Sequence, residues 1–108
     1  MDMDFYTKAE AEKILGGPEE YRAEVYDDSP EYEVDIHDIG KYGGKWFAIR
    51  ATGCSCWGGE YSREAGPFDT LDELRDYILG EYGKVETAYY QPLLDAWSVA
   101  IEEAAKVA

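Results

Sequence analysis

The first pattern of apolar and polar residues in the chain is that of a short helix. Thr7 precedes Glu10 by three residues, the spacing of a capping box, in which each side chain accepts a hydrogen bond from the other residue's backbone amide. Gly16-Gly17-Pro18 then ends the pattern. Because the apolar stripe between these signals is thin, we expect this helix to lie on the surface of a larger body.

Three later segments alternate between apolar and polar residues, which is the pattern of strands. They cover residues 21–26, 31–36 and 45–52. Asp27-Asp28-Ser29-Pro30 supplies turn chemistry between the first two, and the glycine-rich residues 40–44 supply it between the last two. These signals predict three antiparallel strands in a meander.

Helical signals return in the last third of the chain. A second capping box opens a helix at Thr70, and Gly80 closes it. A last helix is predicted from near Val85 or Pro92 to Lys106, because apolar residues recur there at helical spacing.

The order of elements is therefore one helix, three strands, a loop or fourth strand, and two helices. This order predicts an α+β fold, with a small antiparallel three- to four-stranded sheet and helices packed on one face. The sequence contains no repeat, low-complexity tract or Ser/Pro-rich linker, so we expect residues 1–108 to form a single domain.

Charge narrows the choice of partner. The net charge is −14 at pH 7, well beyond the magnitude of about 2–8 that keeps a small domain soluble. Such a surface repels DNA, RNA and anionic lipid and attracts a basic protein groove.

The composition also predicts a folded protein. Aromatic residues make up 15% of the chain, whereas a disordered acidic tail is poor in them. The sequence shows neither a signal peptide nor an apolar run of about 20 residues, so we expect a cytoplasmic protein.

A row of acids is the first candidate for function. Glu31, Glu33 and Asp35 alternate along the second predicted strand, so their carboxylates would project from one face about 6.6 Å apart. Phosphates of one DNA strand advance by about 3.4 Å each, so the row resembles every second phosphate. The alternative is the solvated face of an edge strand, where charge discourages pairing with another chain. Three further acids extend the field: Asp27, Asp28 and Asp38.

The middle of the chain has the opposite charge. Residues 39–66 hold 2 acidic and 4 basic residues, and the basic side chains are mixed with Trp and Tyr, which are enriched in binding hot spots. Alternation places Trp46 and Arg50 on one face of the third strand and Phe47 on the other. We therefore expect these aromatic residues to pack in the core, and the alternative is that Trp46 and Trp57 are partner contacts.

Gly53-Cys54-Ser55-Cys56 places two thiols one residue apart. They can bind a metal, form a strained disulfide or redox pair, or stay reduced in a tight loop. A zinc site would need His37 and a carboxylate as well, so we expect no metal. Thiol catalysis by Cys54 or Cys56 with His37 lacks the arrangement of known thiol enzymes. Gly40–Lys45 lacks the spacing of a phosphate-binding loop, so we expect no enzyme and no cofactor.

The Gly-Cys-Ser-Cys element after a strand, followed by the helix start at Phe68-Asp69-Thr70, resembles small bacteriophage-encoded proteins of unknown function. The resemblance covers about residues 30–80 and implies a phage or prophage origin. It also implies an action against host defences, because short acidic phage proteins without catalytic motifs frequently block CRISPR or restriction nucleases.

The hypothesis from the sequence is a non-enzymatic, DNA-mimicking inhibitor that acts in the host cytoplasm. Its partner would be a basic host protein that binds nucleic acid. The alternatives are a structural or regulatory phage protein without such mimicry, and a cysteine-dependent metal or redox module.

Overall fold

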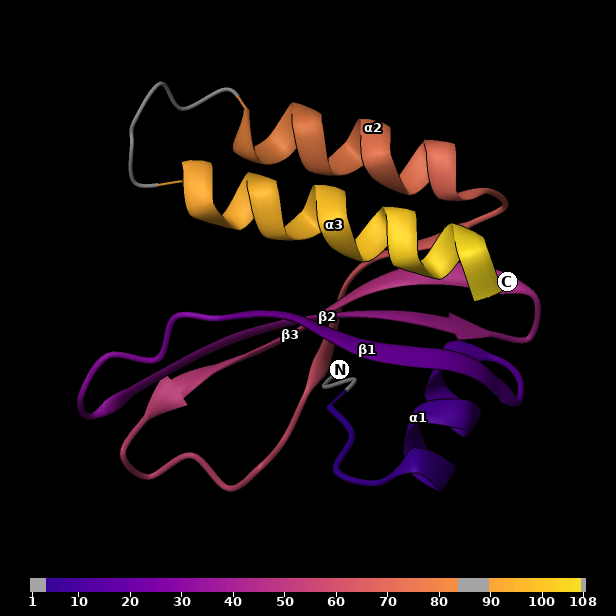
Figure 1. Ribbon diagram of the computed structural model, residues 1–108. Helices are drawn as coiled ribbons and strands as arrows, with labels where there is room; N and C mark the ends of the chain where they lie inside the picture. The colour runs from indigo at the N-terminus through magenta and orange to yellow at the C-terminus, as the bar shows by residue number, and fades with distance from the viewer. Residues whose placement is uncertain (1–3, 84–89, 108) are drawn as a thin grey trace.

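A computed structural model describes residues 4–83 and 90–107 of the protein (Figure 1). Within these residues the chain forms three helices and one four-stranded antiparallel sheet, which confirms the predicted α+β class. The elements follow in the order α1 (Lys8–Leu15), β1 (Glu19–Asp27), β2 (Glu33–Tyr42), β3 (Lys45–Cys54), β4 (Ser62–Phe68), α2 (Leu71–Tyr82) and α3 (Gln91–Val107).

The sheet is a meander with the strand order β1-β2-β3-β4. β2 continues to Tyr42, so the turn to β3 is shorter than residues 40–44 and consists of Gly43 and Gly44 alone. Both glycines have positive φ, 58° and 80°, as a type I′ hairpin turn requires. This turn fixes the register of the hairpin, and it places His37 directly opposite Arg50.

The segment that the sequence analysis left as either a loop or a fourth strand is a strand, β4. It pairs with β3 and forms one edge of the sheet, while β1 forms the other edge. β4 includes Gly66 and Pro67, and the register with β3 shifts between Trp46 and Ala48.

Helices cover both faces of the sheet, as Figure 1 shows. α2 and α3 pack on one face as predicted, and Trp46 of β3 and Trp97 of α3 are buried between these layers. α1 departs from the prediction of helices on one face, because it packs on the opposite face. Its Leu15 meets Phe47 and Ile49, the residues of β3 that point away from Trp46. The sheet therefore buries apolar residues on both faces.

The predicted helix starts are confirmed. The hydroxyl oxygen of Thr7 accepts a hydrogen bond from the Glu10 amide, and that of Thr70 accepts one from the Glu73 amide. α2 passes through Gly80, where we expected it to end, and continues to Tyr82. α3 begins at Gln91, beside the predicted start at Pro92, whereas Val85 lies outside the described residues.

Candidate functional site

Exposed acids gather at the turn between β1 and β2. Asp27, Asp28, Glu31 and Glu33 are all exposed there, and we call these four residues together with Tyr32 the acidic tip. Within the described residues, no ion pair joins any of the four carboxylates to Lys, Arg or His. Among residues 4–83 and 90–107, no basic side chain therefore neutralises their charge.

Tyr32 projects from the middle of the acidic tip. Its side chain is 73% exposed, more than that of any other large hydrophobic residue in the described part of the chain. The amide of Glu33 donates to the carbonyl of Pro30 at 3.0 Å, which closes a turn with Tyr32 at its third position. Tyr32 has a φ of 74°, a value that this position of a type II turn requires and that favours Gly. The chain therefore holds a bulky ring in solvent on a backbone that suits glycine.

A shallow hollow of about 380 Å³ lies beside the acidic tip. Strand pairing forms it, because Glu33 at the start of β2 lies opposite Cys54 at the end of β3. Trp57 is half-buried at its rim, where its indole Nε1 donates to the carbonyl of Glu60 at 2.9 Å. The lining residues are Glu31, Tyr32, Glu33, Val34, Cys54, Ser55 and Trp57.

The predicted row of evenly spaced carboxylates along one strand is wrong. Glu31 lies in the turn that precedes β2, and only Glu33 is both in the strand and exposed. Asp35 is half-buried, because it lies on the face of the sheet that α2 and α3 cover, where it contacts Arg50 at 3.0 Å and His37 at 3.1 Å. Its negative charge therefore interacts with Arg50 and His37 within the protein.

Asp38 is also unavailable to a partner, contrary to the prediction, and Trp46 takes the core position that the sequence analysis weighed against a partner contact. Asp38 is 7% exposed and forms an ion pair with Arg22 of β1 at 2.6 Å. Burial raises the pKa of Asp38, and the nearby Arg22 guanidinium opposes this effect. Trp46 packs into the core under α2 and α3, with its ring edge-on to Tyr21.

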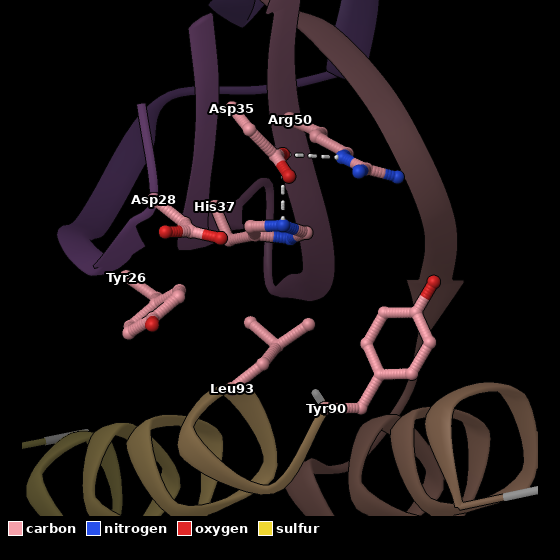
Figure 2. A pocket seen from close by; sticks show the side chains of 7 residues that line it. All are labelled: Tyr26, Asp28, Asp35, His37, Arg50, Tyr90 and Leu93. Carbon is pink, nitrogen blue, oxygen red and sulfur yellow. Dashed lines mark hydrogen bonds and ion pairs between the residues drawn. The ribbon is translucent and has the colours of Figure 1, made fainter. Parts of the chain in front are cut away.

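A second polar cluster surrounds His37, which is 1% exposed (Figure 2). The carboxylate of Asp35 lies between the Nε2 atom of His37 and the Nε atom of Arg50, as the dashed lines show. Arg50 also reaches Glu64 at 3.5 Å, and Glu64 accepts a hydrogen bond from the hydroxyl of Tyr82. The Tyr82 ring meets the imidazole edge-on. The cluster therefore links three strands to α2.

Burial decides the charge state of this cluster. It lowers the pKa of His37, and the neighbouring Asp35 carboxylate only partly opposes this effect. Burial and the hydrogen bond to Glu64 raise the pKa of Tyr82. The adjoining cavity has a volume of about 20 Å³, which is room for one water molecule but not for an organic substrate. Its geometry fits an internal polar network better than a substrate site.

The structure does not bring the candidate thiol and imidazole ligands together. Cys54 and Cys56 are bonded to each other as a disulfide and are exposed at the end of β3, whereas His37 is buried between the sheet and the helices. Among residues 4–83 and 90–107, no group of three potential metal ligands is present. The cysteines also have no histidine base beside them, so the arrangement for thiol catalysis is not formed.

The sequence analysis missed the partners of His37 and the role of Tyr32. A two-residue reading of the turn at Gly43-Gly44 would have placed His37 opposite Arg50, because residues of a hairpin pair symmetrically about its turn. No comparable signal identified Glu64 or Tyr82, because β4 and α2 reach His37 through tertiary packing. Tyr32 lay within the second predicted strand, residues 31–36, so no signal marked it as a turn residue.

Comparisons with protein-family models, with curated proteins and with solved structures found no match to this chain. The fold and the acidic tip define its class as a small acidic α+β protein with exposed carboxylates at one end of its sheet. Among the described residues, none of the helices is long and apolar enough to cross a membrane.

Proposed function

We propose that this protein is a non-enzymatic inhibitor that uses its acidic tip to occupy a basic, nucleic-acid-binding surface of a host defence protein. The observation that carries the proposal is the set of four exposed carboxylates at the tip, none of them ion-paired within the described part of the chain. The resemblance to small bacteriophage proteins supports a CRISPR or restriction nuclease as the target.

The tip offers a partner both charge and apolar contact. Its carboxylates attract Lys and Arg over a distance and speed association, while an exposed aromatic ring supplies the close contact that dominates many interfaces. Tyr32 is such an exposed ring, and it lies among the carboxylates. Its positive φ supports the same role, because a strained residue persists where the surrounding structure or a function retains it. The net charge of −14 keeps free nucleic acid away from the surface.

The experiment immobilises the full chain and passes a bacterial lysate over it, with and without excess duplex DNA. We expect capture of a DNA-binding protein that is released by the DNA and by rising salt. Binding of the purified target is then measured with Glu31→Gln/Glu33→Gln. Its association rate at low salt should fall about tenfold, because these charges act mainly on encounter.

Glu102→Gln/Glu103→Gln is the matched control. It changes the net charge by the same amount on the C-terminal part of α3, which lies at the other end of the sheet in Figure 1. We expect it to leave the association rate within about twofold, because these two charges lie far from the proposed contact and electrostatic attraction falls with distance. Equal effects of the two double variants, or a captured protein that DNA does not release, would favour an interaction protein without mimicry.

Tyr32 gives a second test of the same surface. Tyr32→Gly relieves the backbone and removes the ring, so it should stabilise the fold by roughly 0.5–1 kcal/mol and still weaken binding to the target. A variant that is more stable and binds with unchanged affinity would exclude Tyr32 from the contact.

A further inference from the structure

The Cys54–Cys56 disulfide lies in an exposed turn at the end of β3. The amide of Trp57 donates to the carbonyl of Cys54 at 2.8 Å, which closes this turn independently of the sulfurs. The two Cα atoms are 5.3 Å apart, within the range that a disulfide spans. Cys54, Ser55 and Cys56 are all exposed, so the pair is accessible in the folded protein.

This disulfide contributes little to the stability of the fold. It encloses a single residue, and the restraint that a disulfide places on the unfolded chain grows with the length of the enclosed loop. It also joins no second element to β3. β2 already pairs with that strand as far as Cys54, and β4 pairs with it as far as Arg50. The fold should therefore survive reduction.

We infer that Cys54 and Cys56 form a redox-active site that exchanges reversibly with small thiols. A thiolate attacks one sulfur of the pair, the bond between the two cysteines breaks, and the other cysteine leaves as a thiolate. A second thiol then attacks the mixed disulfide and releases the reductant as its own disulfide. Two electrons and two protons pass from the two small thiols to the two cysteines.

The acidic tip gives this site a preference among thiols. Glu31 and Glu33 line the hollow that Cys54 and Ser55 also line. An approaching thiol therefore enters a field of negative charge, which repels an anionic reductant and favours a cationic one. The substrate class is a neutral or positively charged thiol rather than a negatively charged one.

The test uses the oxidised full chain with cysteamine, which is cationic, and with glutathione, which is anionic. The reaction is quenched with acid, free thiols are alkylated, and mass spectrometry counts the alkyl groups on each chain. Each rate is divided by the rate at which the same thiol reduces bis(2-hydroxyethyl) disulfide, which corrects for intrinsic nucleophilicity. Far-ultraviolet circular dichroism records the fold throughout.

We expect millimolar thiol to reduce the pair while the fold persists, and bis(2-hydroxyethyl) disulfide to restore it. The corrected rate with cysteamine should exceed that with glutathione several-fold. Glu31→Gln/Glu33→Gln should bring the two rates together, and Glu102→Gln/Glu103→Gln should leave them apart. Cys56→Ser retains one thiol and should stop at the mixed disulfide, since no second cysteine is present to displace the small thiol.

Three results would overturn the inference. The pair could resist reduction until the protein unfolds, or its thiols could stay reduced in excess small disulfide, and either result excludes a reversible redox site. Equal corrected rates for cysteamine and glutathione would exclude the substrate preference. None of these readouts depends on a protein partner, so they are independent of the proposed function.

Discussion

His37 is a titratable group enclosed by other polar residues. Its ring is buried, its Nε2 atom contacts Asp35, and Arg50, Glu64, Tyr82 and the carboxylate-bearing Asp28 also lie around it. Burial lowers the pKa of His37 below its ordinary value, so the folded protein favours the neutral ring. The unfolded chain binds a proton as the pH falls through about 6.5, and the folded protein resists that step. The contribution of His37 to stability is thus complete above about pH 6.5 and is lost as the pH falls below it.

We expect this effect to appear as a difference between the protein and His37→Gln, which keeps a donor for Asp35 but does not titrate. Between about pH 7.5 and about pH 5.5, the protein should lose unfolding free energy relative to the variant, because the unfolded chain takes up a proton that the folded protein resists. Urea unfolding followed by circular dichroism measures both. Contributions from other groups, such as Asp38, are common to both proteins and cancel. A constant difference across this range would show that burial does not control the imidazole.

At the scale of elements, features that depend on neighbouring residues could be predicted from the sequence. Features that depend on pairing between distant segments could not. Helix starts were predictable because a cap acts within four residues, as at Thr7 and Thr70. β4 was left open because Gly66 and Pro67 are unusual in strands. It is a strand because β3 offers it a free edge.

The same distinction explains which acidic residues were correctly predicted to be exposed. The exposure of Asp28 followed from its place in the predicted turn, and that part of the candidate site was predictable, whereas Glu31 was assigned to a strand and lies in the turn. Asp35 and Asp38 were misjudged because their partners, Arg50 and Arg22, lie 15 and 16 residues away in the sequence. Only strand register brings such pairs together.

The junction between α1 and the β2–β3 hairpin depends on a close backbone contact. A Cβ atom on Gly17 would lie 2.4 Å from the Cα atom of Gly43, far inside van der Waals contact. The Gly43 amide also donates to the carbonyl of Pro18 at 3.0 Å, so neither segment can move away freely. We expect Gly17→Ala to destabilise the protein by about 1–3 kcal/mol, the range for overpacking, as measured by urea unfolding.

Gly80 provides the matched control for Gly17→Ala. It lies within α2, and a Cβ atom there would meet nothing within 4 Å. Gly80→Ala should therefore stabilise the protein by about 0.5–1 kcal/mol, because alanine favours the helix. Opposite signs for the two substitutions identify backbone contact as the cause, and a neutral Gly17→Ala would contradict it.

At the scale of the whole molecule, acids outnumber bases by 24 to 10. Several ion pairs lie at the surface, among them Arg75 with Asp72 and Lys106 with Glu103. Exposed pairs of this kind contribute about 0–1 kcal/mol each. The surplus of carboxylates exceeds what these pairs can neutralise, so net repulsion dominates the electrostatics of the folded state.

Salt should therefore stabilise the protein. Raising sodium chloride from about 20 mM to about 200 mM at pH 7 should increase the unfolding free energy by roughly 0.5–1 kcal/mol, because it screens repulsion between carboxylates. Urea is the denaturant, since guanidinium chloride is itself a salt. Glu31→Gln/Glu33→Gln should respond less to salt. A fall in stability with salt would show that attractive pairs outweigh the repulsion.

The two edges of the sheet bear on how copies of this chain behave when crowded. β1 exposes Glu20 and Glu24 along one edge, and β4 carries Pro67, which has no amide hydrogen to offer, on the other. Two molecules that met edge to edge would bring like charges together or lack a donor for the ladder. Both edges of the native sheet therefore obstruct the growth of a cross-β fibril.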